Sequence, residues 1–262
     1  MNRIFLIPLG VLALFTGGVL FSLLLRISPG EVISALASEE TRFALKLSFM
    51  TSFFSTALAL LLAVPSGYFL ARTAFPGKAI LDTFLDLPLV ITPLVAGVGL
   101  LFLFGNEMLG NQLARWGIHV LFTPLGAVLA QTFVACPIVM RSSRAAFERV
   151  GYGYEWAAAT MGLRPVQVFF QVSLPMAKKG ILAGCLLGWT RAMGEFGATL
   201  MVAGAIRFKT ETLPIAVYLS ISSGEMGTAI ACAWILMAAG FLLLLALRSI
   251  DHGTRPGTSL RG

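Results

Sequence analysis

Arg191 and Glu195 stand four residues apart inside a long apolar segment of the chain. An i,i+4 spacing brings two side chains to the same side of a helix, so the two can form an ion pair. A charge inside a membrane is costly unless it is paired or in contact with water. Two interpretations stay open. The pair, with Thr199 one turn further on, lines or gates a path for an anion, or it locks this helix to its neighbours.

Side chains that usually carry catalysis are scarce in this chain. It has 3 cysteines and 2 histidines, with no CxxC, HExxH or histidine cluster that would suggest a metal or a nucleophile. The Gly77-Lys78 pair lacks both the first glycine and the Ser or Thr of a phosphate-binding loop. We therefore predict no catalytic residue, no metal and no cofactor, and we expect that any ATP hydrolysis is carried out by another chain.

The composition is typical of an integral membrane protein. Hydrophobic residues make up 57% and charged residues 12%, whereas soluble domains carry about 25% charged residues. A membrane-spanning helix needs about 20 apolar residues. We expect an all-α membrane protein with one transmembrane domain over residues 1–262, a core at about 45–248 and a retained N-terminal helix at 5–25. The six predicted spans are Phe5–Leu25, Leu45–Ala71, Leu81–Phe104, Thr123–Met140, Ile181–Ala203 and Gly227–Leu247.

The positions of Lys and Arg predict the orientation. With both termini in the cytoplasm, about twice as many basic residues fall inside as outside, among them Arg3, Arg255 and Arg261. This bias agrees with the positive-inside rule. We interpret the net charge of +7 as a topology signal and not as a nucleic-acid surface, because no soluble domain carries a basic face.

A loop at about 141–180 is the one sizeable segment predicted on the inner side. Its stretch EWAAATMGLRPVQVFFQVSLP predicts two short helices. Gly162 would cap the first and Pro165 would start the second. Val166, Phe169, Phe170 and Ser173 would fall near one face, and Pro175 would close the second helix. Such a pair contacts a partner protein, folds back on its own bundle, or lies in the lipid headgroups.

Prolines and glycines mark further positions within the spans. Pro65, Pro88, Pro93 and Pro137 predict kinks or broken helices near a transport path. Glycines 180, 184 and 188 recur every four residues, a pattern that favours close packing of helices.

The residue spacing within the predicted inner loop at about 141–180 resembles the EAA loop of bacterial and archaeal ABC importer permeases. In that pattern Glu155, Ala157, Ala158 and Gly162 are followed, after nine residues, by the Val-x-Leu-Pro run that begins at Val172. The resemblance implies a type I permease fold with six transmembrane helices, whose cytoplasmic coupling helices contact a separate ABC ATPase. Trp156 departs from the usual pattern. The residues implied in this coupling are Glu155, Ala157, Ala158, Gly162, Pro165, Leu174 and Pro175.

A second stretch, RAMGEFGATLMVAGAIRFKTETLPIAVY from Arg191 to Tyr218, resembles permeases for molybdate and tungstate. Sulfate and thiosulfate permeases are the alternative. The resemblance implies a homodimer in the inner membrane, two ATPase copies and a periplasmic or lipid-anchored molybdate-binding protein. Arg207, Lys209 and Glu211 would contact that protein, or they lie in a solvated loop. A secondary transporter is less favoured, because Glu195 is the one acid placed in mid-membrane.

Overall fold

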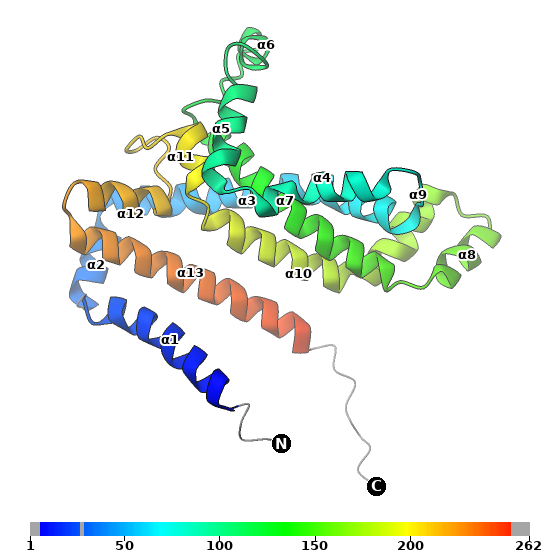
Figure 1. Ribbon diagram of the computed structural model, residues 1–262, viewed down its shortest axis with the longest axis horizontal. Coiled ribbons are helices and arrows are strands. Elements are labelled where there is room, and N and C mark those ends of the chain that lie inside the picture. The colour runs from blue at the N-terminus through cyan, green and yellow to red at the C-terminus, as the bar shows by residue number, and fades with distance from the viewer. Residues whose placement is uncertain (1–5, 27–28, 253–262) are drawn as a thin grey trace.

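The computed structural model describes residues 6–26 and 29–252 and is drawn in Figure 1. Phe5, where the first predicted span begins, and Arg3, Arg255 and Arg261 lie outside the described residues. Every regular element in the described ranges is helical, which confirms the all-α prediction. The elements are α1 (Leu6–Leu24), α2 (Pro29–Ala37), α3 (Glu39–Arg72), α4 (Lys78–Val90), α5 (Pro93–Leu103), α6 (Gly110–Arg115), α7 (Pro124–Glu148), α8 (Tyr152–Thr160), α9 (Pro165–Val168), a π-helix (Phe169–Ser173), α10 (Leu174–Met193), α11 (Gly197–Ala203), α12 (Leu213–Ser222) and α13 (Met226–His252).

Helices α3, α7 and α10 pack together as the centre of the bundle, and α13 lies against α10. Helix α3 has 34 residues, so it is about 51 Å long at a rise of about 1.5 Å per residue. It begins at a cap in which the Ser38 hydroxyl accepts the N–H of Thr41 at 3.2 Å. Figure 1 shows α8 and α9 at one end of this bundle and α2 and α12 at the other.

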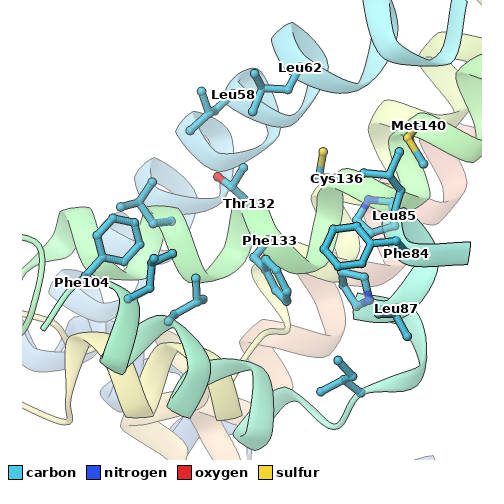
Figure 2. A pocket seen from close by; sticks show the side chains of 16 residues that line it. Leu58, Leu62, Phe84, Leu85, Leu87, Phe104, Thr132, Phe133, Cys136 and Met140 are labelled. Carbon is cyan, nitrogen blue, oxygen red and sulfur yellow. The ribbon is translucent and has the colours of Figure 1, made fainter. Parts of the chain in front are cut away.

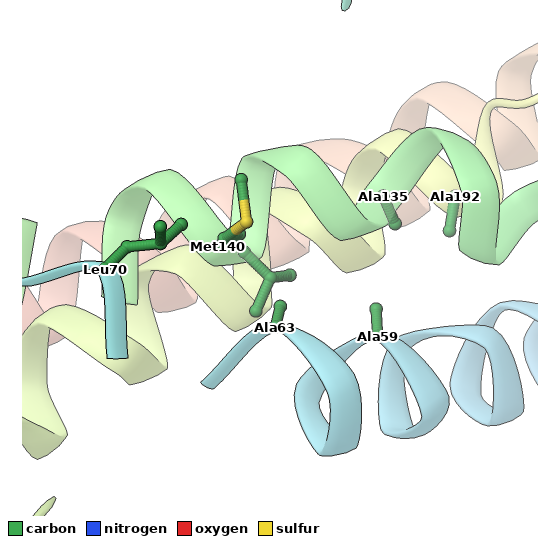
Figure 3. Packing of buried hydrophobic residues seen from close by; sticks show 7 residues of the cluster. Ala59, Ala63, Leu70, Ala135, Met140 and Ala192 are labelled. Atoms are coloured by element: carbon green, nitrogen blue, oxygen red, sulfur yellow. The ribbon is translucent and has the colours of Figure 1, made fainter. Parts of the chain in front are cut away.

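Small residues let the central helices approach closely. A Cβ atom added to Gly180, Gly184 or Gly188 would lie 2.4 to 2.6 Å from a side-chain atom of α7. The glycine stripe therefore faces α7, as its spacing predicts, and it has a packing role. Next to it, Ala59 and Ala63 of α3 face Ala135 and Met140 of α7 in a buried cluster (Figure 3).

Within the described residues, three helices are long and apolar enough to span a membrane: α3, α7 and the part of α13 from Met226 to Ala246. They cover the second predicted span and all but one terminal residue of the fourth and of the sixth. The fourth span continues as a helix to Glu148, so the loop predicted to begin at residue 141 begins later. Two ion pairs, Arg141–Asp86 at 3.0 Å and Arg144–Asp82 at 2.9 Å, hold this added part of α7 against α4.

The third and fifth predicted spans are not single helices. Helices α4 and α5 are bent by 111° at the break between them. Thr92 is extended there, with φ −62° and ψ 143°, because a residue that precedes a proline avoids the helical region. The fifth span is broken between Met193 and Gly197. By contrast, Pro65 and Pro137 lie inside continuous helices. Six spans therefore remain a prediction.

Candidate functional site

The turn between α8 and α9 has the backbone shape that the sequence predicts. Gly162 has φ +87°, a left-handed conformation that glycine adopts without steric cost. The N–H groups of Gly162 and Leu163 donate to the carbonyls of Ala159 and Ala158 at 3.0 and 3.2 Å, which closes α8. Pro165 then opens α9. Two short helical segments therefore meet at this glycine.

The second segment runs directly into a long helix. Pro175 does not close it, because a π-helix over Phe169–Ser173 connects α9 to α10. The N–H of Leu174 bonds to the carbonyl of Phe169, five residues back. A wide turn of this kind next to a proline, which has no N–H to donate, keeps the helix continuous. The predicted loop is thus shorter than residues 141–180 and is joined to α10 without a break.

Glu155 points into the protein and is 8% exposed. Arg72 Nε and Nη2 donate to its carboxylate at 2.7 to 2.9 Å, and the Ser173 hydroxyl donates at 2.6 Å. Arg72 Nη2 also donates to the carbonyl of Val150 at 2.9 Å. The sequence did not identify Arg72 or Ser173 as partners of Glu155. The one signal for Arg72 is its place at the polar end of an apolar run.

Four large apolar side chains on α8, α9, the π-helix and the turn at Gly162 are exposed. Trp156 is 73% exposed, Met161 75%, Val166 66% and Phe170 60%. We call these four residues the apolar face. The predicted grouping is therefore split, because Phe169 and Ser173 turn inward while Val166 and Phe170 turn outward. Of the other predicted coupling residues, Ala157 and Pro165 are exposed, Ala158 is buried, Leu174 is half-buried and Pro175 is exposed.

Arg191 and Glu195 form the predicted pair, with Nη1 and Oε2 2.6 Å apart. Glu195 is buried, and its Oε1 accepts the N–H of Ala198 at 2.9 Å in the first turn of α11. Arg191 keeps 37% of its side chain exposed and lines a cavity of about 310 Å³ beside Thr92 and Pro93. The hydroxyl of Thr199 is buried without a hydrogen-bond partner among the described residues. The arrangement fits both sequence interpretations, a lock between helices and a wall of a path.

A larger cavity of about 460 Å³ lies between α3, α4, α5 and α7 (Figure 2). Its lining is almost entirely apolar, with side chains such as Leu58, Leu62, Phe84 and Phe133. A site for an anion needs charged or hydrogen-bonding groups, because burying an unpaired charge is costly. This cavity is therefore not suited to bind an oxyanion.

At the other end of the bundle, the segment between α11 and α12 holds Arg207, Lys209 and Glu211. Arg207 lies 3.2 Å from Glu40, and both Arg207 and Lys209 are exposed. Glu211, in contrast, is fully buried. Its Oε2 accepts the N–H of Phe208 at 3.2 Å, and its Oε1 has no hydrogen-bond partner among the described residues. Burial raises the pKa of Glu211 to about 7, and the Glu40 carboxylate adds to the rise.

Phe208, at the tip of this segment, was not singled out by sequence reasoning. Its backbone has φ +55°, which is uncommon for a bulky residue, and its side chain is 52% exposed. Its ring lies 5.8 Å from that of Phe43. Arg207, Phe208 and Lys209 are thus three consecutive exposed residues in this segment.

Residues 63–256 match the family described as the binding-protein-dependent transport system inner membrane component. The chain belongs to this family.

Curated relatives of the permease support this assignment over most of its length. The molybdenum transport permease ModB of Mycobacterium tuberculosis is 35% identical over 90% of each chain. ModB of Escherichia coli is 40% identical over 73% of this chain and 87% of its own. The sulfate transport permease CysT of Escherichia coli is 36% identical over 78% of this chain and 73% of its own.

The fold of the permease is also that of a solved transporter. An inward-facing structure of the MetNI methionine ABC transporter superimposes with a TM-score of 0.61 and 19% identity, over 87% of this chain and all of that one. The permease therefore has the fold of type I ABC importer subunits. By family it is a multi-pass inner membrane component that works with an ATPase and a substrate-binding protein. It is not catalytic, because a separate ATPase hydrolyses ATP.

Proposed function

We propose that this permease imports molybdate or tungstate as a homodimer, with two copies of the ATPase and a periplasmic or lipid-anchored molybdate-binding protein. Both termini are in the cytoplasm in this proposal, which turns α8 and α9 toward the ATPase. The observation that carries the proposal is the hinged pair of helices at Gly162, whose apolar face is exposed at the end of the bundle. An exposed apolar surface rimmed by polar groups is typical of an interaction site.

The apolar face fits a groove on a partner protein. Trp156 and Phe170 are large anchors of the type that dominates binding energy in protein interfaces. A short helix that presents such anchors binds by laying them in a hydrophobic groove. In the proposed cycle, ATP binding closes the two ATPase copies. The helices at Gly162 transmit this movement, and the two permease bundles rock between outward and inward openings.

The proposed path runs beside Arg191, Glu195 and Thr199. The guanidinium of Arg191 is paired with Glu195 through Nη1 and is partly exposed to the cavity of about 310 Å³, so it can attract a dianion. The negative charge of Glu195 limits how tightly that anion is held. At the far end, Arg207 and Lys209 are the exposed charges that would contact the binding protein. Glu211 is buried and would act there through its neighbours.

Molybdate is the proposed substrate for two reasons. The stretch from Arg191 to Tyr218 resembles molybdate permeases. In addition, ModB of Escherichia coli is 40% identical to this chain, whereas CysT of the same organism is 36% identical. Sulfate is the second candidate, since CysT aligns over a similar length.

The test is uptake of labelled molybdate into liposomes that hold the permease and its ATPase, with the binding protein added outside. We expect uptake that requires ATP and that excess tungstate suppresses more than excess sulfate. Stronger suppression by sulfate would assign the permease to sulfate. Uptake by the permease alone, without the ATPase, would favour a secondary transporter.

A further inference from the structure

The buried carboxylate of Glu155 joins three parts of the permease that are distant in sequence. It belongs to α8, its guanidinium partner Arg72 is the last residue of α3, and its hydroxyl partner Ser173 is the last residue of the π-helix that leads into α10. Arg72 and Glu155 are 83 positions apart, and Ser173 and Glu155 are 18 apart. We call these three residues the clamp.

Further contacts strengthen the link to α3. The guanidinium of Arg72 lies 4.6 Å from the centre of the Tyr152 ring, and the Tyr152 hydroxyl donates to the carbonyl of Ala71 at 3.2 Å. The Tyr68 hydroxyl lies 3.5 Å from Glu155 Oε2. The N-terminal half of α8 is thus held on the end of α3 by an ion pair, hydrogen bonds and a stacked ring.

The clamp is suited to transmit movement because it is both buried and directional. The side chains of Arg72 and Glu155 are 8% and 10% exposed, so solvent weakens their attraction little. Paired hydrogen bonds from a guanidinium to a carboxylate also fix geometry, unlike an exposed ion pair between flexible side chains. Because α3 and α10 both pack on α7, a displacement of α8 would reach the centre of the bundle through two helices.

We propose that Arg72 and Ser173 are positioning residues that hold Glu155, so that the clamp carries displacement of α8 to α3 and α10, and that Glu155 does not contact the ATPase. This inference rests on the proposed function, because it assumes that α8 receives the movement of the ATPase. Within that function it separates two roles: the apolar face binds the ATPase, and the clamp converts binding into movement of the transmembrane helices.

The test compares Arg72→Gln, Glu155→Gln, the double variant and Ser173→Ala in the assembled transporter with its ATPase and binding protein. We would measure co-purification with the ATPase, ATP hydrolysis, and molybdate taken up per ATP hydrolysed. The control is Arg149→Gln, which removes an exposed positive charge next to Val150. It should leave all three values unchanged.

We expect Arg72→Gln and Glu155→Gln to keep normal co-purification and hydrolysis but to lower uptake per ATP about tenfold. The double variant should be no worse than either single variant, because both remove the same interaction. Ser173→Ala leaves the ion pair in place and should lower uptake per ATP about threefold. A variant with only a folding defect would instead lower the yield of complex and leave the ratio unchanged.

Two results would overturn the inference. Normal uptake per ATP in Arg72→Gln would show that the clamp does not couple. Loss of ATPase binding in Glu155→Gln but not in Arg72→Gln would show that Glu155 is a direct contact. Failure of the proposed function is distinguishable, because the unmodified transporter would then show no ATP-dependent molybdate uptake.

A spin-label measurement tests the clamp without any transport. Labels at Ala74→Cys, just beyond α3, and Thr160→Cys, at the end of α8, would be placed in a chain whose native cysteines are replaced. We expect Arg72→Gln to broaden the distance distribution between the labels. An unchanged distribution would overturn the mechanical role of Arg72.

Discussion

Two buried carboxylates, one near each end of the permease, differ in how completely they are paired. Glu155 accepts hydrogen bonds from Arg72 and Ser173, so its charge is compensated. Glu211 accepts one N–H, its Oε1 has no hydrogen-bond partner in the described part of the chain, and the carboxylate of Glu40 lies beside it. A compensated buried charge fixes geometry, whereas an incompletely paired one makes its region depend on pH. The difference suggests a rigid connection at the α8 end and a pH-sensitive loop at the other.

The largest effect that would sharpen this contrast is expected at Gly162. Gly162→Val places a β-branched residue at φ +87°, a conformation that such residues rarely adopt. Apart from the two adjacent residues, no atom of the described chain lies within 4 Å of the added Cβ, so the damage would come from the backbone and not from a clash. We expect ATPase co-purification and uptake to fall to background while the protein still inserts into the membrane.

Gly99→Val is the matched control, because its Cβ also meets open space and its φ is not positive. It should behave as the unmodified permease does. Normal co-purification of Gly162→Val would contradict the proposal that α8 and α9 bind the ATPase.

The next effect is expected on the apolar face. Trp156 is 73% exposed, so Trp156→Ala should leave thermal stability almost unchanged. If the side chain fills a groove on the ATPase, its loss should weaken association about 10- to 100-fold, as measured by titration of ATPase into the purified permease. Equal affinity for both proteins would place the interface elsewhere. The expected loss of affinity in Trp156→Ala would separate binding by Trp156 from coupling by its neighbour Glu155.

The turn at Gly162 could be predicted from the sequence, but the direction of Glu155 could not. A glycine followed by a proline determines its backbone locally, within a few residues. The burial of Glu155 depends on Arg72, 83 positions away, and no local pattern links the two. Helical periodicity also predicts one face for Val166, Phe169, Phe170 and Ser173, but Phe169 and Ser173 turn inward, since that periodicity does not anticipate a π-helix. The Arg191–Glu195 pair was predictable because both residues share one helical turn.

A smaller effect is expected at Glu211, where a substitution should raise stability at high pH and not impair the protein. Because burial raises its pKa from 4.5 to about 7, the folded protein holds a proton that the unfolded chain releases above about pH 4.5. Stability is therefore fully present below that pH and is lost as the pH rises through about 7. The shift corresponds to ~3 kcal/mol at most. Glu211→Gln should remove this dependence, so that melting temperatures in detergent no longer fall between pH 5 and 8.

The melting temperature in detergent, measured between pH 5 and 8, distinguishes the carboxylate of Glu155 from that of Glu211 directly. Glu155→Gln should lower the melting temperature across this pH range, because it leaves the Arg72 charge buried without its partner. Glu211→Gln should raise the melting temperature at pH 8 and change it little at pH 5. A pH profile that Glu211→Gln does not alter would remove the contrast between the two ends.

The smallest effect is expected from Arg207→Gln. The Arg207–Glu40 pair is exposed, with 41% of the Arg207 side chain in solvent, so its loss should cost less than ~1 kcal/mol. Its positive charge lowers the pKa of Glu211, so removing it should move the pH midpoint of stability upward. Lys209→Gln removes another exposed charge from the same loop and should not move the midpoint. In the Glu211→Gln background, Arg207→Gln should have no pH-dependent effect, because the group that responds to Arg207 is no longer titratable.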